Sequence, residues 1–86
     1  MKLIFSERAW EDYLYQETDR RLVTRIHQLI REIQREPFAG IGKPEPLRHA
    51  FQGYWSRRIN DEHRLIYRVR GNDLEIAACH GHYLDK

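Results

Sequence analysis

The sequence is poor in cysteine, and Cys79 is the one cysteine among its 86 residues. A single cysteine cannot form a disulfide within the chain, and such usage is typical of a reducing compartment. No apolar run approaches the ~20 residues that a membrane-spanning helix needs. The first residues, MKLIFSERAWED, become acidic too early for a signal peptide. We therefore expect a cytoplasmic protein that does not associate with a membrane.

Motifs for the common cofactors are also missing. The chain has neither a glycine-rich loop at the Walker spacing nor the fingerprint of a dinucleotide-binding domain. Cys79, His80 and His82 are grouped near the carboxyl end, but no second cluster stands at ligand spacing, and neighbouring arginines would oppose a cation. We therefore expect no metal and no cofactor, and we interpret Cys79 as a packing residue rather than a nucleophile.

Positive charge is concentrated in the middle of the chain. Its length suits a single domain, which we take to span residues 1–86, and its net charge is only +2. Residues 42–70 hold seven lysines and arginines against three acidic residues, a net charge of +4, whereas the rest of the chain carries −2. A basic segment in a nearly neutral chain favours a phosphate-bearing ligand.

Two helices are expected near the amino end, after a short strand at residues 2–5. Ser6 is a good amino-terminal cap for the first helix, and Thr18 or Asp19 for the second. The second helix has the clearest apolar periodicity and must end before Pro37, which cannot continue a helix. Its opposite face is rich in arginine, which we interpret as a solvated surface. The apolar positions of the second helix are Leu22, Ile26, Leu29, Ile30 and Ile33.

The second half of the chain predicts a loop and then two β-hairpins. Residues 37–52 are punctuated by proline and glycine and are expected to form the loop. The first hairpin spans residues 53–67, GYWSRRINDEHRLIY, with its turn at residues 60–62. The second turns at residues 71–72, a Gly-Asn pair that tolerates positive φ. Its expected apolar pairs are Val69 with Leu74, Tyr67 with Ile76, and Leu65 with Ala78.

Strand alternation then assigns residues to the two faces of the sheet. Arg58 and Arg64 should share the face that points away from the helices, and Cys79 should lie on that face too. The same alternation places His82 on the core side, unless a bulge or the end of the strand at Gly81 intervenes.

The charged residues of the basic segment suggest a chemistry. Arginines fixed on a sheet suit a phosphate, because each guanidinium can donate two parallel hydrogen bonds, and the first hairpin offers Arg57, Arg58 and Arg64. Glu45 lies on a loop stiffened by flanking prolines, where it could be a general base or an ordinary loop anion. The arginines could equally form a solvated surface. Together with a terminal His-Tyr pair, these residue types are the set needed for RNA cleavage by the neighbouring 2′-hydroxyl. The candidates are Glu45, Arg48, Arg58, Arg64, His82 and Tyr83.

Several runs of the sequence resemble the YoeB/Txe toxins, the RelE-like mRNA interferases of bacterial toxin–antitoxin systems. The matching runs are KLIFSERAWEDYLY, GKPEPL, GYWSRRINDEHRLIY and AACHGHY, which together cover nearly the whole chain. The resemblance implies an α+β fold in which two amino-terminal helices pack on a twisted, mainly antiparallel four-stranded sheet. It also implies a metal-independent endoribonuclease that cleaves mRNA in the ribosomal A site and inhibits translation.

The resemblance assigns a role to each matching position. Glu45 would be the general base, Arg64 would stabilise the transition state, and His82 would be the general acid. Tyr83 would position the substrate base or stack on it. The positions that would hold phosphate are Arg48, where family members often carry lysine, and Arg58.

Partners are implied as well. The resemblance points to the ribosome and mRNA as targets, to a cognate YefM-like antitoxin whose disordered tail folds along the helices, and to a homodimer. Relatives tend to end at the terminal tyrosine, whereas this chain continues with residues 84–86. The alternative is a non-catalytic RNA- or ribosome-binding module on the same fold. A gyrase-targeting relative is disfavoured because Glu45, Arg64 and His82 occur together.

Overall fold

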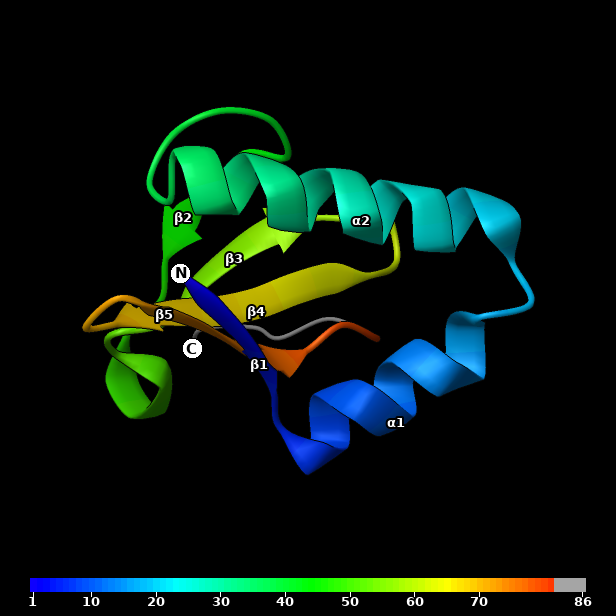
Figure 1. Ribbon diagram of the computed structural model, residues 1–86, viewed down its shortest axis with the longest axis horizontal. Coiled ribbons are helices and arrows are strands. Elements are labelled where there is room, and N and C mark those ends of the chain that lie inside the picture. Colours follow the sequence, from blue (N-terminus) through cyan, green and yellow to red (C-terminus); the bar gives the residue numbers. More distant parts are fainter. Residues whose placement is uncertain (82–86) are drawn as a thin grey trace.

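The computed structural model describes residues 1–81, which form a five-stranded sheet with two helices (Figure 1). Within these residues, no helix is both long and apolar enough to cross a membrane. Strand β1 pairs with β5 in parallel, and every other neighbouring pair in the order β1-β5-β4-β3-β2 is antiparallel. The elements are β1 (Lys2–Phe5), α1 (Glu7–Gln16), α2 (Arg20–Arg35), β2 (Glu45–Pro46), the 3-10 helix η1 (His49–Phe51), β3 (Trp55–Arg58), β4 (Arg64–Arg70) and β5 (Asp73–Ala78).

This arrangement confirms the predicted α+β fold and its mainly antiparallel sheet, but the sheet has five strands rather than four. The additional strand is β2, which the sequence placed inside a loop. Its two residues pair with β3 at the edge of the sheet, where Pro46 is tolerated because an edge position needs no backbone N–H on its outer side.

Both helices begin where their capping residues predict. The Ser6 hydroxyl accepts a hydrogen bond from the Ala9 N–H at 3.0 Å, and the Asp19 carboxylate accepts from the second and third backbone N–H groups of α2. Of the two caps considered for α2, Asp19 is therefore the one used. The helix ends at Arg35, before Pro37, as expected.

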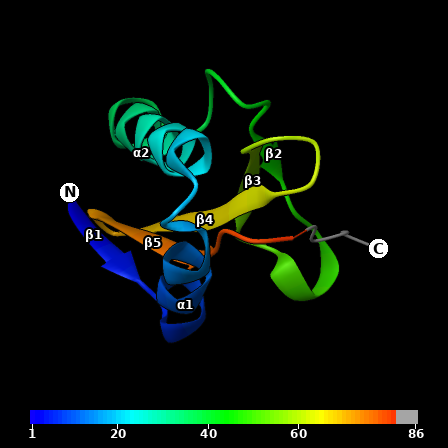
Figure 2. The same cartoon turned by 90° about the vertical axis from the view of Figure 1, so that its right-hand side faces the viewer.

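The core lies between the sheet and the helices. Its centre is formed by the predicted apolar stripe of α2, and Ala9 of α1 belongs to the same cluster. Figure 1 shows α2 running along the sheet, and Figure 2 shows η1 on the opposite side of the strands. A smaller cluster of Leu47, Ile66 and Ala78 covers that opposite face. The buried residues from the sheet and its first turn are Ile59, Leu65, Tyr67, Leu74 and Ile76, with Cys79 beyond the end of β5.

A β-bulge corrects the predicted register of the second hairpin. Two of the three expected pairs are present, Val69 with Leu74 and Tyr67 with Ile76, but Ala78 pairs with Ile66 instead of Leu65. The extra residue shifts the alternation by one, so that Ala78 joins the smaller cluster. The following residue, Cys79, was expected on the arginine face. It is instead fully buried in the main core.

Candidate functional site

Glu45 is presented by an element with restricted freedom. It lies opposite Ser56 in the β2–β3 pairing, and the adjoining Leu47 N–H donates to the Tyr54 carbonyl at 2.9 Å. Just before it, Lys43 adopts a left-handed φ of 52° that turns the chain into the edge strand. The carboxylate is exposed on the face shared with Ser56, so two prolines and a short sheet pairing together fix its backbone.

Arg58 and Arg64 face each other across the neighbouring strand pair. Their Cα atoms are direct partners in the β3–β4 register, which confirms that they share one face of the sheet. Ser56 and Ile66 form the adjacent row on that face, and Ile66 belongs to the smaller cluster. The register therefore places Glu45 and the two arginines on the same side of the sheet, away from the helices.

Four charged side chains on or beside this face have no partners within residues 1–81, whereas Arg68 on the same face pairs with Glu75. Glu45, Arg48 and Arg58 are exposed, Arg64 is half-buried, and none of the four side chains makes a hydrogen bond or ion pair there. Two cations directly opposite each other on a sheet repel and destabilise it. Two opposed arginines that lack acidic partners are suited to binding an anion, because a phosphate would neutralise both charges. We call Glu45, Arg48, Arg58 and Arg64 the arginine face.

Arg57 does not belong to the arginine face, although the sequence suggested that all three hairpin arginines were available. Its side chain is 0% exposed and makes four hydrogen bonds inside the protein. The Nε atom donates to the Tyr67 hydroxyl at 3.1 Å, and the terminal nitrogens donate to three backbone carbonyls. Arg57 therefore anchors the start of the loop that leads to Glu45. The accepting carbonyls are those of Glu36, Ala39 and Ile41, at 2.7, 2.9 and 3.0 Å.

The end of the described chain returns to the arginine face. The Arg64 N–H donates to the Gly81 carbonyl at 3.1 Å, and the Gly81 N–H donates to Nδ1 of His63 at 2.9 Å. His82 and Tyr83 lie outside the described residues. The expectation that His82 lies on the core side assumed unbroken alternation along the strand, and the bulge in β5 interrupts that alternation.

The titratable groups in the core are not suited to catalysis. Burial, and secondarily the Asp12 carboxylate, raises the pKa of the Cys79 thiol to about 12, so the thiol remains protonated at neutral pH. Burial also raises the pKa of Tyr67, against the opposing effect of Arg57. Both groups lie on the helix side of the sheet, which supports the interpretation of Cys79 as a packing residue.

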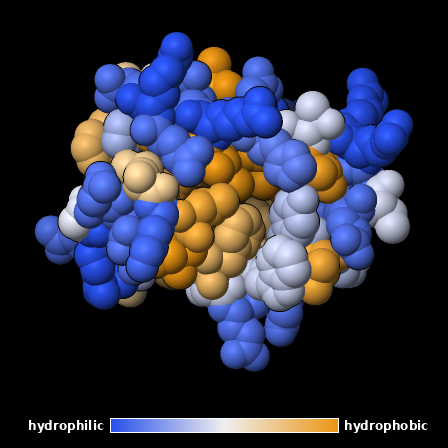
Figure 3. All heavy atoms as spheres, viewed as in Figure 1, coloured by the Kyte–Doolittle hydropathy of each residue, from blue (hydrophilic) through white to orange (hydrophobic). Residues whose placement is uncertain are grey.

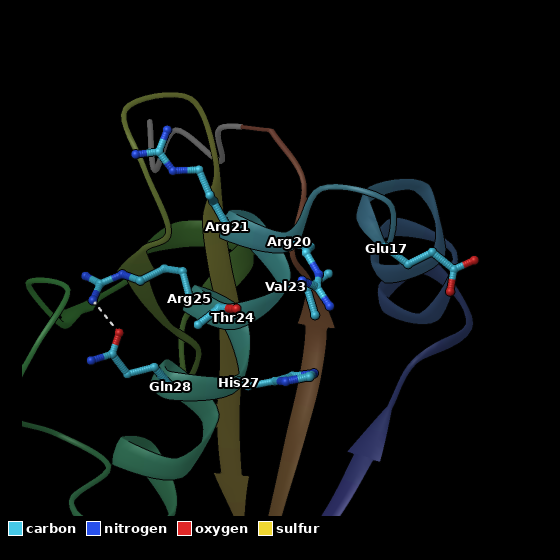
Figure 4. Close-up of a pocket in the computed structure, with 8 residues that line it drawn as sticks. All are labelled: Glu17, Arg20, Arg21, Val23, Thr24, Arg25, His27 and Gln28. Carbon is cyan, nitrogen blue, oxygen red and sulfur yellow. Dashed lines mark hydrogen bonds between the residues drawn. The ribbon is translucent and has the colours of Figure 1, made fainter.

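A second basic surface lies on α2. Figure 4 shows a hollow between the amino half of α2 and the end of α1, with Arg20, Arg21 and Arg25 around it. Arg25 donates to the Gln28 side chain at 3.2 Å, and farther along the helix Arg35 pairs with Glu32 at 3.2 Å. Such pairs are typical of a solvated helix face, as the sequence suggested.

An apolar groove separates α2 from β1. Figure 3 shows hydrophobic side chains at the centre of this view, bordered above by the hydrophilic face of α2. Beside the groove, α1 exposes half of Trp10, which stacks on Tyr13. This surface lies away from the arginine face. The groove is lined by Leu3, Phe5, Tyr13, His27, Ile30, Arg31 and Gln34.

Comparisons with known proteins agree with one another. A family model described as YoeB-like toxin of bacterial type II toxin-antitoxin system matches residues 5–83. The toxin YoeB of Escherichia coli K12 is 60% identical over 84 residues, covering 96% of this chain and 100% of that protein. The YoeB/ParE toxin from Agrobacterium tumefaciens superposes with a TM-score of 0.94 at 51% identity, covering 96% of this chain and 100% of that one.

Two solved structures from Staphylococcus aureus are also similar. One is a YoeB dimer with a TM-score of 0.89, and the other is a heterotetrameric YoeB–YefM toxin–antitoxin complex with a TM-score of 0.88. Each YoeB chain is 46% identical to this one, and each match covers 96% of this chain and 98% of that one. The family model, the similar sequences and the similar structures therefore indicate the same family and the same fold. The chain belongs to the YoeB-like toxins of bacterial type II toxin–antitoxin systems.

Proposed function

We propose that this chain, as a single toxin domain over residues 1–86, is a ribosome-dependent endoribonuclease of the bacterial cytoplasm. It cleaves mRNA in the ribosomal A site without a metal ion and so inhibits translation. The observation that carries the proposal is the arginine face, where an exposed carboxylate and two opposed arginines have no partners within residues 1–81. Membership of the YoeB-like toxins supports the same conclusion.

The reaction follows from the chemistry of these groups. Glu45 takes the proton of a ribose 2′-hydroxyl, and the freed oxygen attacks the adjacent phosphorus. The bond from phosphorus to the 5′-oxygen breaks, His82 gives that oxygen a proton, and a 2′,3′-cyclic phosphate remains. Arg64 stabilises the negative charge that builds up on the phosphate oxygens in the transition state. The opposed arginines are already held in position by the sheet, which reduces the cost of reorganisation during the reaction.

Substrate is held by residues around this centre. Arg58 and Arg48 bind the phosphates on either side, and Tyr83 stacks on the substrate base. Arg48 immediately precedes η1 and is exposed, so its side chain can reach the strand of RNA that lies along the sheet. Where Arg48 replaces the lysine that relatives often carry, it can contact two phosphate oxygens at once.

Restraint of the enzyme requires a partner. We propose a cognate YefM-like antitoxin whose tail folds on the apolar groove beside α2, and a homodimer as the second assembly. Exposed Leu3 and Trp10 border that groove and are suited to burial against an apolar tail. The solved YoeB–YefM complex and YoeB dimer support these assemblies.

The decisive experiment is cleavage of a defined mRNA in purified translating ribosomes. Glu45→Gln and His82→Ala are each expected to slow cleavage by about 10²–10⁴-fold, because each removes a proton-transfer group. Arg64→Met is expected to slow it by about 10²–10³-fold, while ribosome binding falls only modestly. Glu11→Gln is the matched control, since it removes the same charge as Glu45→Gln from an exposed position on α1.

Binding to ribosomes without cleavage by the natural sequence would refute the proposal. It would favour the alternative, a non-catalytic ribosome-binding module. Equal loss of cleavage in Glu11→Gln and Glu45→Gln would show that general charge, rather than a positioned base, matters.

A further inference from the structure

The final described residues lie beyond the last strand pairing and are held by three side chains and one backbone N–H. Strand β5 ends at Ala78, yet the backbone of residues 79–81 remains fixed. Cys79 is bound from α1, with its N–H donating to the Asp12 carboxylate at 3.0 Å and its carbonyl accepting from Gln16 Nε2 at 2.7 Å. Gly81 is bound from the opposite side, by residues at the start of β4.

We infer that His63 is a positioning residue whose Nδ1 atom holds Gly81 beside Arg64 and thereby sets where His82 begins. The Gly81 N–H donates to that atom at 2.9 Å, and the Arg64 N–H donates back to the Gly81 carbonyl at 3.1 Å. Two hydrogen bonds thus fix the peptide unit on both sides of Gly81. The inference rests on the proposed function, because His82 is the general acid only in that mechanism.

The imidazole is itself held in place, so it can act as a support. The backbone N–H of His63 donates to the Asn60 side chain at 2.7 Å, and its carbonyl accepts from the Ile59 N–H at 2.9 Å. Its ring lies 4.5 Å from the ring of His80, centre to centre, and the His80 ring lies 4.8 Å from the ring of Tyr15. A series of contacts therefore connects the turn of the first hairpin, through the rings of His63 and His80, to Tyr15 on α1.

The hydrogen bond also defines the chemical form of His63. A backbone N–H can only donate, so Nδ1 must carry a lone pair and the ring proton lies on Nε2. Gly81 adopts a φ of 85°, which favours glycine, although a Cβ atom there would meet no other atom within 4 Å. The local turn is therefore set by backbone conformation and by this acceptor, not by crowding.

Two variants of the full-length protein separate the acceptor from the ring. His63→Leu removes the acceptor but keeps a side chain that fills space. His63→Asn places its Oδ1 at the same number of bonds from the backbone as Nδ1, so it can still accept from Gly81. Each is compared with the natural sequence by amide hydrogen exchange at Gly81 and by single-turnover cleavage on translating ribosomes. Thermal unfolding is used to check that both variants fold.

His63→Leu is expected to speed exchange of the Gly81 amide and to lower the maximal cleavage rate by about 10²-fold, as misplacement of a catalytic group by ~1 Å does. The ribosome concentration that gives half the maximal rate should be unchanged, because substrate binding depends on other residues. His63→Asn should restore both slow exchange and most of the cleavage rate.

Other outcomes overturn the inference. Exchange at Gly81 that is equal in all three proteins would mean that no such anchor exists. Slow cleavage by His63→Asn as well as His63→Leu would assign the effect to the ring rather than to the acceptor. Unimpaired cleavage by His63→Leu would show that the anchor has no role in positioning. If the natural sequence does not cleave at all, the proposed function fails, whereas exchange at Gly81 still tests the anchor separately.

Discussion

Arg57 and Arg58 are adjacent in the sequence and chemically identical, yet the fold uses them in opposite ways. Arg57 is completely buried and donates hydrogen bonds to four oxygen atoms. Arg58 is exposed, and within residues 1–81 its side chain has no partner while the like charge of Arg64 lies opposite. One guanidinium stabilises the fold, and the other lies where it weakens the fold but can bind an anion.

The cause is the alternation of a β-strand, since successive side chains point to opposite faces. On the helix side, a cation is acceptable because Arg57 donates to three backbone carbonyls of residues 36–41 and to the Tyr67 hydroxyl. On the other side, water solvates the cation until a ligand replaces it. A single peptide bond therefore separates an arginine that supports the core from one that is available to a ligand, and variants of the two can be compared directly.

The largest effect on stability is expected from replacing Arg57, and the same replacement of Arg58 is the comparison. Arg57→Met leaves three backbone carbonyls and the Tyr67 hydroxyl without their donor, and should lower the free energy of unfolding by about 3–5 kcal/mol. Arg58→Met should leave it within about 0.5 kcal/mol, or raise it slightly, because a repulsion disappears. Urea unfolding of the two variants measures this contrast. Equal destabilisation by both would contradict the assignment of Arg57 as the structural residue.

The same pair shows how much of the molecule the sequence alone could predict. Helix caps, the shared face of Arg58 and Arg64, and the paired residues next to the Gly71-Asn72 turn depend on local rules, and all were predicted correctly. The burial of Arg57 was not predicted, although strand alternation places Arg57 on the face opposite to Arg58.

Three features could not be predicted from local pattern. The β-bulge between β4 and β5 is one of them, because no glycine or proline marks it in either strand. Strand β2 forms by pairing with β3, which is distant in sequence, and a two-residue segment that contains proline has no sequence pattern that predicts a strand. The contact of His63 with Gly81 likewise joins residues 18 positions apart.

A smaller effect on stability is expected from substituting Gly42, a loop residue that contacts both Arg57 and Arg58. Its carbonyl accepts from the Arg58 N–H at 2.7 Å, and its φ is 81°. An added Cβ would approach a Leu29 methyl to 2.9 Å and the Arg57 Cβ to 3.2 Å. Gly42→Ala should therefore lower the free energy of unfolding by about 1–3 kcal/mol. Gly53→Ala is the control, since it also has positive φ but an open surrounding, and should cost less in the same urea titration.

The smallest effect on stability is expected at Cys79. Like Arg57 and Arg58, the adjacent residues Ala78 and Cys79 lie on opposite faces of the sheet. Burial raises the pKa of the Cys79 thiol from 9.0 to about 12, so the folded protein holds its proton at a pH where the unfolded chain has lost it. The stabilisation from this proton is complete below about pH 9 and is lost as the pH rises towards 12.

Cys79→Ala removes that dependence and leaves the raised pKa of Tyr67 in place, so the two proteins differ at high pH by the thiol alone. Between about pH 8 and pH 10.5, the natural sequence should lose about 1–2 kcal/mol more of its free energy of unfolding than Cys79→Ala, at about 1.4 kcal/mol per pH unit. Urea unfolding at the two pH values measures the difference. Parallel losses would mean that Cys79 reaches solvent in the folded protein. In that case the bulge would not divide Ala78 and Cys79 between the two faces as the alternation divides Arg57 and Arg58.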